Sequence, residues 1–423
     1  MRKLKPFLFF LVFIVVIFTS CSTLKKTTVF QNSKEATEKP YVILISLDGF
    51  RWDYVKRFSP PNLSKFIENG TKATSLIPSF PTKTFPNHYT IATGMYPENH
   101  GLLGNSFYSH ENNSFYSIRD RKKVEDGKYY GGTPIWVLAN NSNMVTASYF
   151  FVGSEADVKG VRPSYYFPYN GKTPNIDRVN QVVDWLKMPS DKRPHLITMY
   201  FSDMDDIGHR YGPNNDEAIK EGLYSLDNTL GELFKKTKEL NLPVNIVIVS
   251  DHGMLEVKTD KFISIDAIKN DELYSVVSNG TIVNIHPKNP KKLEEVYTYL
   301  TSRKGPYKVY KTAETPYFEY VPKNKNWGPF QVIPNDGYYF TYRKKSKMSK
   351  EVFVTGQHGF SPEKKEMHGI FYANGPVFKK GYTTASVKNI HIYPLLCKIL
   401  ELTPPKDIDG NIEKLKNILK KQN

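Results

Sequence analysis

Short apolar runs alternate with amphipathic stretches along most of the chain. Three of the runs contain or end in acidic residues: YVILISLDGF (41–50), HLITMYFSDMD (195–205) and NIVIVSDHGM (245–254). Uninterrupted, β-rich runs of this length are typical of strands that are buried on both faces of a parallel sheet. Helices are predicted over 61–69, 176–187, 215–239 and 387–401. The pattern therefore predicts an α/β sandwich, with a central, mainly parallel sheet, helices on both of its faces and ligands at the carboxyl ends of its strands.

The pattern changes between residues 256 and 355. One amphipathic stretch (290–303) is surrounded by pieces rich in Tyr, Pro and Lys, and the segment contains none of the acidic strand ends. We therefore predict that 256–355 is a small inserted cap subdomain. It divides the core into a first part, 41–255, and a second part, 356–423.

The N-terminus has the layout of an export signal. A basic start is followed by twelve apolar residues from Phe7 to Phe18, too few to span a bilayer comfortably, which takes about twenty. Thr19 and Ser20 then precede Cys21, and we interpret residues 1–20 as a signal peptide. An uncleaved anchor or an accidental cysteine is the alternative.

A cut before Cys21 resembles the processing of a bacterial lipoprotein, in which this cysteine is the lipidated residue. We therefore expect a lipid on Cys21, followed by a polar tether over 21–40. The protein is then exported and anchored to a bacterial membrane, facing the periplasm or the cell surface. If Cys21 is acylated, no disulfide can form, because the other cysteine, Cys397, is alone. It lies in an apolar stretch and is expected to be a buried small hydrophobe.

Composition and charge narrow the choice of partner. The chain is 39% hydrophobic and 14% aromatic, which fits a globular protein with a packed core. Its formal net charge of +16 invites a nucleic-acid interpretation. Lysines are scattered, however, and pairs such as Lys122-Lys123 sit in loop-like sequence. We therefore interpret a generally basic surface that favours anionic substrates, and we expect a monomer that forms no stable nucleic-acid complex.

A threonine stands at the predicted entrance of a helix in the segment TKTFPNHYTIATGMYPENHG (82–101). Pro86 suits a first helical turn, and Gly94 is expected to end the helix. The hydroxyl of Thr84 would therefore lie beside free backbone N–H groups, a place that attracts phosphate or carboxylate. The simpler alternative is that Thr84 is only an N-cap.

Carboxylates and imidazoles recur where the apolar runs end. They are Asp48, Asp205, His209, Asp251, His252 and, opening the last core segment, His358. Zn²⁺ and similar ions prefer this combination when no thiolate is offered. A single aspartate at a strand end is more often a cap or turn residue, but the joint occurrence predicts a metal site. The other histidines, His88 among them, are assigned to structure or solvent.

The order and the amino-acid sequences of these segments resemble those of a known family. The segments are LDGFRWDY, PTKTFPNHYTIATGMYPENHGLLGN, DDIGHRYGP, SDHGM, HGF and MHGIFYANGPVF. Together they are similar to the nucleotide pyrophosphatase/phosphodiesterases of the alkaline phosphatase superfamily, here in a bacterial lipoprotein form. The resemblance runs from about Tyr41 to the C-terminal DIDGNIEKLKNIL and implies the alkaline-phosphatase-like sandwich.

The resemblance also implies two Zn²⁺ ions per chain and a role for each motif residue. One ion would be held by Asp205, His209 and His358. The other would be held by Asp48, Thr84, Asp251 and His252. Thr84 would attack phosphorus and form a phosphothreonine, while Asn105 would donate a hydrogen bond to a phosphate oxygen.

The implied substrates are nucleotide phosphodiesters and pyrophosphates, cleaved to release a nucleoside 5′-monophosphate. Phe85 and Tyr200 match positions that flank the nucleobase in the family. Tyr165 or Tyr166 is similar to a third aromatic residue there. Stacking on such rings tolerates any base, so little base preference is expected.

Several other functions stay open. A choline or lysophospholipid phosphodiesterase would need a pocket that the divergent cap could hold, and a phosphomonoesterase would need an extra cation. Arg51 and Arg210 are interpreted as surface residues, and Asp53, Asp206 and Lys83 as structural, so no such cation is evident. A sulfatase would need Cys or Ser in place of Thr84. A lipoprotein that only binds metal or an anionic polymer would not require Thr84 among the ligands.

Overall fold

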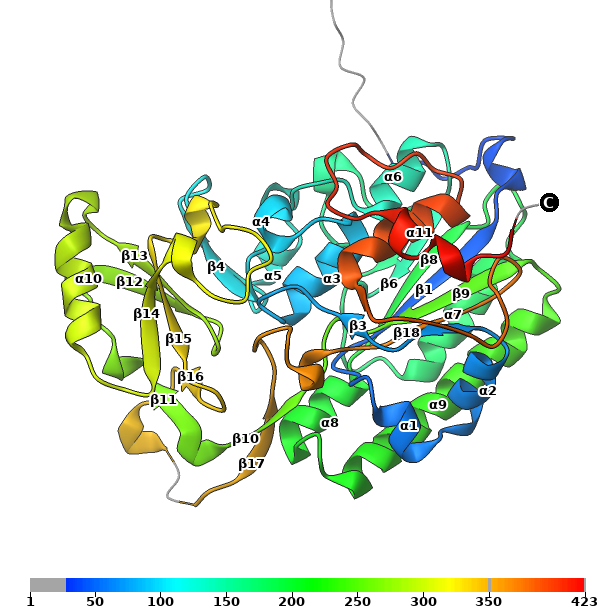
Figure 1. Cartoon of the computed structure of the whole chain (residues 1–423). Coiled ribbons are helices and arrows are strands. Elements are labelled where there is room, and N and C mark those ends of the chain that lie inside the picture. The colour runs from blue at the N-terminus through cyan, green and yellow to red at the C-terminus, as the bar shows by residue number, and fades with distance from the viewer. Residues whose placement is uncertain (1–27, 349–350, 422–423) are drawn as a thin grey trace, which may run out of the picture.

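The larger of the two lobes of the protein is built on an eight-stranded sheet (Figure 1). The computed structural model describes residues 28–348 and 351–421. In spatial order the strands are β19 (Tyr382–Thr384), β2 (Thr71–Ala73), β18 (Phe371–Asn374), β9 (Val244–Val249), β1 (Tyr41–Leu47), β8 (Leu196–Phe201), β6 (Thr146–Tyr149) and β7 (Tyr165–Phe167). Neighbouring strands are parallel except where β18 meets β2 and β9. The predicted mainly parallel sheet is confirmed.

The central strand β1 is covered on both faces, and all seven of its residues are buried. Val42 and Leu44 belong to the hydrophobic cluster on one face of the sheet, whereas Ile43 and Ile45 belong to the cluster on the other. This alternation follows from the two-residue period of a strand. It explains why β1, β8 and β9 read as continuous apolar runs.

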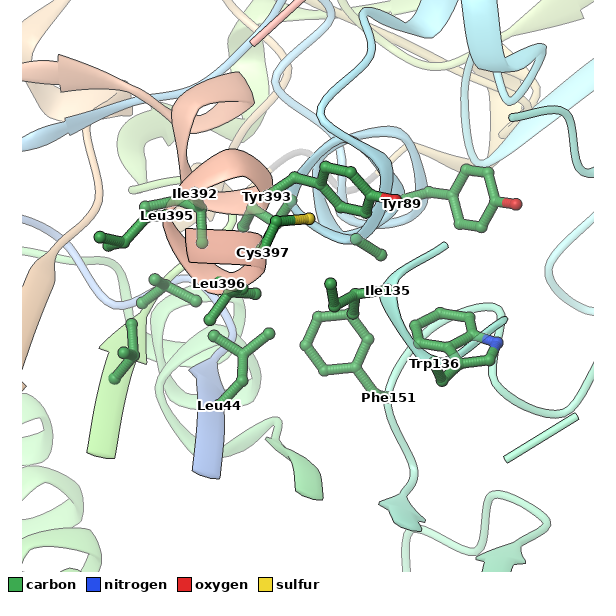
Figure 2. Close-up of a cluster of buried hydrophobic side chains, with 14 of the residues drawn as sticks. Leu44, Tyr89, Ile135, Trp136, Phe151, Ile392, Tyr393, Leu395, Leu396 and Cys397 are labelled. Carbon is green, nitrogen blue, oxygen red and sulfur yellow. The ribbon is translucent and has the colours of Figure 1, made fainter. Parts of the chain in front are cut away.

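Helices cover both faces of the sheet. On one face lie α3 (Thr84–Thr93), α6 (Ile135–Asn141) and α11 (Ile392–Ile399), whose side chains surround Leu44 (Figure 2). Cys397 of α11 is buried in this cluster, as predicted, and burial raises the pKa of its thiol to about 12. On the other face lie α2 (Pro61–Glu68), α7 (Asn175–Lys187) and α9 (Asp216–Glu239). No helix in the described part of the chain is long and apolar enough to cross a membrane.

The helices are α1 (Tyr54–Phe58), α2 (Pro61–Glu68), α3 (Thr84–Thr93), α4 (Pro97–His100), α5 (Arg121–Val124), α6 (Ile135–Asn141), α7 (Asn175–Lys187), α8 (Asp203–Tyr211), α9 (Asp216–Glu239), α10 (Leu293–Ser302) and α11 (Ile392–Ile399). The predictions at 61–69, 176–187 and 215–239 match α2, α7 and α9. The prediction at 387–401 is too long. Residues 387–388 form strand β20 beside β3, and a 3₁₀ turn follows before α11 begins.

The smaller lobe has its own sheet and hydrophobic cluster, on the left of Figure 1. Its strands lie in the order β12 (Tyr274–Ser278), β13 (Val283–Pro287), β15 (Phe330–Pro334) and β14 (Tyr307–Lys311), all antiparallel, and α10 packs beside them. The chain enters the lobe after β10 (Leu255–Lys258) and leaves it at β17 (Val354–Gln357), which pairs with β10. We refer to the segment between these two strands as the cap.

The remaining short strands pair with one another in two-stranded sheets. They are β3 (Leu76–Ile77), β4 (Ser106–Ser109), β5 (Ser114–Ser117), β11 (Phe262–Ser264), β16 (Tyr339–Thr341) and β20 (Val387–Lys388). Glu98 of α4 fastens the cap to the larger lobe. Its carboxylate accepts hydrogen bonds from the backbone of Lys323 and Asn324 and from the indole of Trp327.

The segment predicted as a tether is in part packed against the larger lobe. The side chain of Asn32 donates to the carbonyls of Ser190 and Arg193 and accepts from the backbone of Val145. Ala36 is buried. The tether prediction is therefore wrong for residues 28–40. Cys21 and residues 1–20 lie outside the described residues, so lipidation and export stay predictions.

Candidate active site

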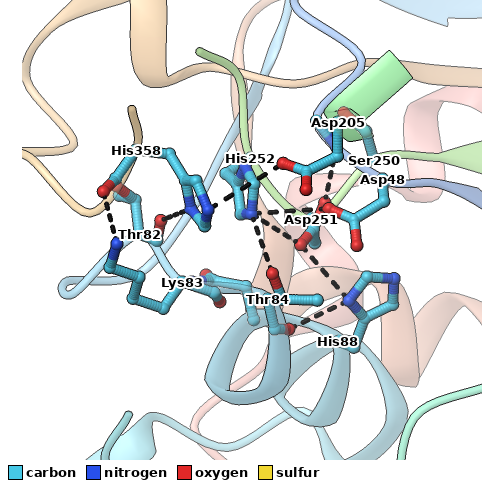
Figure 3. Close-up of polar contacts among 12 residues, drawn as sticks. Asp48, Thr82, Lys83, Thr84, His88, Asp205, Ser250, Asp251, His252 and His358 are labelled. Carbon is cyan, nitrogen blue, oxygen red and sulfur yellow. Dashed lines mark hydrogen bonds and ion pairs between the residues drawn. The ribbon is translucent and has the colours of Figure 1, made fainter. Parts of the chain in front are cut away.

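Three acidic residues meet at the carboxyl edge of the sheet. Asp48 directly follows β1, Asp251 follows β9, and Asp205 lies in the first turn of α8, just after β8. Because β1 lies between the other two strands and runs parallel to both, these positions converge (Figure 3). Gly49 permits the approach. It has a φ of +64°, and a Cβ atom there would lie 2.8 Å from the Cα of Asp205.

The first group of candidate metal ligands consists of Asp48, Asp251 and His252. Their ligand atoms all lie within 4.8 Å of one another. Nε2 of His252 is 3.5 Å from Oδ1 of Asp48 and 3.0 Å from Oδ2 of Asp251. The hydroxyl of Thr84 is 3.3 Å from the same nitrogen. The structure therefore brings together all four residues that were predicted for one metal ion.

The second group consists of Asp205, His252 and His358, within the same 4.8 Å limit. The rings of His252 and His358 stack with centroids 3.7 Å apart. His209 is at the edge of this group, with Nε2 3.5 Å from Oδ2 of Asp205. The structure thus brings the predicted set of Asp205, His209 and His358 together, and it adds His252 as a shared neighbour of both groups.

The histidines are oriented by backbone carbonyls. Nδ1 of His209 donates to the carbonyl of Gly356 over 2.7 Å, and Nδ1 of His358 donates to that of Thr82 over 2.9 Å. Because a carbonyl can only accept, the proton must be on Nδ1, and the lone pair of Nε2 faces the cluster. Histidines that bind metals are commonly held in this way. Burial lowers the pKa of His358 well below its ordinary value, so this ring stays neutral and free to act as a ligand.

The carboxylates have oxygen atoms without hydrogen-bond partners. Among the residues that the structure describes, none donates a hydrogen bond to the buried Oδ1 of Asp48, Oδ1 of Asp205 or Oδ2 of Asp251. The nearest nitrogens to Oδ2 of Asp251 are those of His252 at 3.0 Å and His88 at 3.3 Å, which form ion pairs with it only when protonated. Burial and the nearby charges of Asp251 and Asp205 raise the pKa of Asp48 well above its ordinary value. Such an arrangement is unfavourable unless a cation neutralises it. The donor set of carboxylates and imidazoles fits a zinc-type divalent ion.

Thr84 is the first residue of α3, and Lys83 occupies the N-cap position. The alternative that Thr84 is only an N-cap is therefore wrong. Gly94 ends α3 with a φ of +69°, as predicted. The hydroxyl of Thr84 is free of any capping role and points to His252.

Asn105 lies beside the start of α3. Its side-chain oxygen accepts a hydrogen bond from the backbone N–H of Phe85 over 3.0 Å. This contact fixes the amide plane next to Thr84. Within residues 28–348 and 351–421, its NH₂ group donates to no protein atom, so it is available to a ligand.

His88 also belongs to the site, although the sequence interpretation assigned it to structure or solvent. Its Nδ1 donates to the carbonyl of Thr84 over 2.9 Å and lies 3.3 Å from Oδ2 of Asp251. Its Nε2 then accepts from the hydroxyl of Ser46 over 2.8 Å. A signal was present in the sequence, because His88 is four residues after Thr84 and hence on the same helix face.

We expect His88→Ala to weaken metal binding by about 10- to 100-fold, the usual effect of losing a residue that orients a ligand. The reason is that Asp251 loses its imidazole neighbour and Thr84 loses the contact at its carbonyl. Metal titration of the purified variant measures the change. His88→Asn should restore part of the affinity, since its amide can still donate to the carbonyl of Thr84. An affinity equal to that of the wild type in His88→Ala would show that His88 only fills space.

Tyr200 and Tyr165, two of the aromatic residues predicted to bind the substrate, make different contacts. The hydroxyl of Tyr200 donates to Oδ2 of Asp48 over 2.6 Å, so this residue positions a candidate ligand. Tyr165 donates to the carbonyl of Lys192, and its ring lies near Phe30.

Tyr169, which the sequence interpretation did not choose, packs beside Tyr200, with ring centroids 6.1 Å apart. A contact of Tyr165 or Tyr166 with a nucleobase stays a prediction. Both lie inside β7, which ends at Phe167, and Tyr169 lies just beyond the strand, where the sheet edge faces the site.

The interpretation of Arg51 as a surface residue is wrong. Arg51 is buried, and its side chain forms an ion pair with Asp53 over 2.7 Å. Arg210 is exposed, as expected, and Asp206 accepts a hydrogen bond from Ser202 outside the cluster.

Comparisons with known proteins show to which family the chain is similar. The family model described as type I phosphodiesterase/nucleotide pyrophosphatase matches residues 42–361. Human ectonucleotide pyrophosphatase/phosphodiesterase family member 1 is 33% identical over 397 residues, which are 90% of this chain and 42% of the relative. The chain therefore spans less than half of that protein. Bis(5′-adenosyl)-triphosphatase of Xenopus laevis is 30% identical over 386 residues, 90% of this chain and 82% of the relative.

A solved structure of murine ectonucleotide pyrophosphatase/phosphodiesterase 5 shares the fold. It has a TM-score of 0.83 and 30% sequence identity, and the match covers 90% of this chain and 100% of that one. The solved protein is an inactive variant, with a threonine replaced by alanine, in complex with AMP. From the family model, the sequence identities and the fold, this chain belongs to the type I phosphodiesterase/nucleotide pyrophosphatase family.

Proposed function

We propose that the protein is a zinc-dependent hydrolase of nucleotide phosphodiester and pyrophosphate bonds that releases a nucleoside 5′-monophosphate. The observation that carries the proposal is the surroundings of Thr84. Thr84 is the first residue of α3, and its hydroxyl lies 3.3 Å from Nε2 of His252, in a cluster of carboxylates and imidazoles. The free NH₂ group of Asn105 lies beside it.

Two Zn²⁺ ions fit the donor set. We propose that one is held by Asp205, His209 and His358, and the other by Asp48, Asp251, His252 and the hydroxyl of Thr84. Bound there, the ions would lower the pKa of a hydroxyl or water and balance the negative charge of a phosphate. The buried carboxylate oxygens without hydrogen-bond partners support this assignment.

Thr84 is proposed to act as the nucleophile. Its hydroxyl gives up its proton to the solvent as Oγ forms a bond to phosphorus, while the bond from phosphorus to the leaving oxygen breaks. The leaving group departs with that oxygen and the bonding electrons, and takes up a proton. The nucleoside stays esterified to the resulting phosphothreonine. Water then attacks the same phosphorus, which releases the nucleoside 5′-monophosphate and restores the hydroxyl of Thr84.

Charge that develops on the phosphate needs fixed donors. The NH₂ group of Asn105 is available, and the backbone N–H of Thr84, at the start of α3, has no partner inside the helix. Donors held in place before the reaction stabilise a developing oxyanion without further reorganisation. The inactive threonine variant of the murine relative supports the role of Thr84.

The nucleoside is proposed to lie against Phe85 and Tyr169. Phe85 follows the nucleophile directly, and Tyr169 packs against Tyr200, which in turn holds Asp48. Stacking on aromatic rings is worth about 1–3 kcal/mol per base and accepts any base. The AMP bound to the murine relative supports a nucleoside 5′-monophosphate as the product held here.

A hydrolysis panel tests the proposed function. The substrates are a nucleotide diester, a dinucleoside pyrophosphate, a phosphate monoester and a choline phosphodiester, each with and without chelator. We expect rapid release of nucleoside 5′-monophosphate from the first two, and loss of that release with chelator. Preferred cleavage of the choline diester or the monoester would instead identify the corresponding enzyme of the same superfamily.

A further inference from the structure

The first described residues pack along one edge of the eight-stranded sheet. The hydroxyl of Thr28 donates to the carbonyl of Arg162 over 3.0 Å, and Arg162 lies just before β7. The side chain of Asn32 accepts from the backbone N–H of Val145, just before β6. Strands β1, β6, β7 and β8 are parallel, so these contacts lie where the strands begin. Residues 28–40, which we refer to as the N-terminal segment, therefore follow the amino edge of the sheet.

The candidate active site lies at the opposite edge of the same sheet. Asp48 follows β1, which is seven residues long, or about 23 Å at the usual rise of a strand. The cap lies beyond this carboxyl edge, because the chain enters it through β10 after β9 has ended. In Figure 1 the N-terminal segment, dark blue at the upper right, and the cap, on the left, are on opposite sides of the larger lobe. The whole length of the central strand thus separates this segment from the site.

Packing of the N-terminal segment shortens the connection to the lipid that the sequence predicts on Cys21. Only residues 22–27 separate Cys21 from Thr28, which is bonded to the larger lobe. A chain spans at most about 3.6 Å per residue, so Thr28 lies within about 25 Å of the lipid in any conformation of these residues. A free tether up to Tyr41 would have allowed about 70 Å. The amino edge is therefore held close to the membrane.

The short connection prevents the active site from turning toward that membrane. If the carboxyl edge faced the bilayer, Thr28 would be raised above it by the length of β1 and also by the cap. The helix α10 of the cap alone is about 10 Å across. Together with β1, at about 23 Å, it exceeds the reach of about 25 Å that residues 22–27 allow.

Phe30 offers the membrane an apolar contact beside the connection. It lies two residues after Thr28, and its side chain is 59% exposed. Its ring packs edge-on against Tyr165 at the start of β7, with centroids 6.3 Å apart. Aromatic side chains of this kind bind at the boundary between lipid headgroups and acyl chains. The amino edge thus carries a residue suited to contact with lipid.

We propose that the amino edge of the sheet, covered by the N-terminal segment, rests on the membrane that holds the Cys21 lipid, and that the active site opens away from it. The inference rests on the predicted lipid and, for the substrate, on the proposed function. The enzyme accordingly hydrolyses dissolved phosphodiesters and does not reach the phosphodiester headgroups of its own membrane. This orientation disfavours a phospholipid of that membrane as the substrate.

Energy transfer measures the orientation without any turnover. Acylated protein is added to phosphatidylcholine vesicles that contain a lipid-linked acceptor dye, with a donor dye on Lys34→Cys in the N-terminal segment or Lys304→Cys in the cap. Both lysines are exposed, and Cys397 is buried, so only the introduced cysteine reacts. We expect at least about twofold higher transfer efficiency from position 34, since the connection holds that edge within about 25 Å of the lipid.

Equal transfer from the two positions, or higher transfer from the cap, would overturn the orientation. Wild-type protein that carries no lipid on Cys21 would overturn it as well, because the contact with the membrane depends on that lipid. Since the readout needs no catalysis, it decides the orientation even if the hydrolysis panel shows no phosphodiesterase activity.

A longer connection tests the consequence for the substrate. About thirty Gly and Ser residues are inserted between Thr27 and Thr28, which gives a flexible connection with an average reach of about 35 Å and a far greater full length. The substrate is a nucleotide diester joined by a short linker to a lipid of the same vesicle. We expect the lengthened protein to cleave it at least about tenfold faster than the wild type, since its site can now turn to the surface.

The matched control carries the same insertion after Lys421, at the other end of the chain, and should cleave the lipid-linked diester as slowly as the wild type. All three proteins should cleave the dissolved diester at similar rates. Equal rates of the wild type and the lengthened protein on the lipid-linked diester would overturn the exclusion of membrane substrates. Loss of activity on the dissolved diester in all three would instead contradict the proposed function.

Discussion

Thr84→Ala should lower kcat for a nucleotide diester by about 10⁴-fold or more, the scale of losing a nucleophile, while the metals and the fold remain. The hydroxyl is the atom that forms the new bond to phosphorus in our account. Its only described partner is His252, at 3.3 Å. Alanine is compatible with the first turn of α3, because Thr84 caps nothing.

Thr84→Ser is the matched variant, since it keeps a hydroxyl at the same place. It should retain part of the rate, whereas alanine retains almost none. Metal content and the thermal unfolding midpoint, measured on both variants, check that only the chemical step changed. If Thr84→Ala turned over near the wild-type rate, water would attack phosphorus directly and the two-step scheme would be wrong.

Removal of the metals should lower activity nearly as much as Thr84→Ala does. We expect active protein to contain two zinc equivalents, and chelation or Asp205→Asn to lower kcat/KM by about 10³-fold, the scale of losing a main electrostatic stabiliser. The reason is that Asp205 has a buried oxygen with no hydrogen-bond partner and lies beside both His209 and His358. Elemental analysis together with turnover measures the effect.

Asp206→Asn is the control for this prediction. Asp206 neighbours Asp205 in sequence, but it is exposed and accepts a hydrogen bond from Ser202 away from the cluster. The control should keep both metal equivalents and nearly full activity. Active protein with one metal equivalent or none, or equal losses in the two variants, would contradict the two-metal site.

The sheet and the acidic ends of its strands could be predicted because their signal is local. A strand buried on both faces is mostly apolar, and the polar residues that come soon after it lie near the sheet edge. Asp48 directly follows β1, whereas Asp251 and Asp205 come shortly after β9 and β8. That Thr84 and His252 meet, 168 residues apart, depended on the family resemblance and not on periodicity.

The sequence analysis missed features that depend on contacts between residues far apart in the chain. His88 lies on the same helix face as Thr84, but its importance comes from Asp251 and Ser46, which are far away in the chain. The helix predicted over 387–401 is shortened because residues 387–388 pair with β3, a contact that no local pattern contains.

The tyrosine that packs beside Tyr200 was missed for a different reason. In the run RPSYYFPY, the residue that reaches Tyr200 depends on where β7 ends, and a strand end is uncertain by a few residues in sequence. The strand ends at Phe167, and Tyr169, just beyond it, is the residue whose ring packs beside Tyr200. Similarly, polar composition suggested a free tether before Tyr41, but Asn32 satisfies backbone groups of the larger lobe.

The central claim is that Thr84 carries the nucleotide during turnover, and a trapped intermediate tests it most directly. Protein mixed with diadenosine triphosphate is quenched in acid within one turnover, digested and examined by mass spectrometry. We predict one adenylyl group on the peptide that contains Thr84, and none after quenching of Thr84→Ala. Active wild-type protein without any adenylylated peptide at all quench times, or with the group on another residue, would contradict the account.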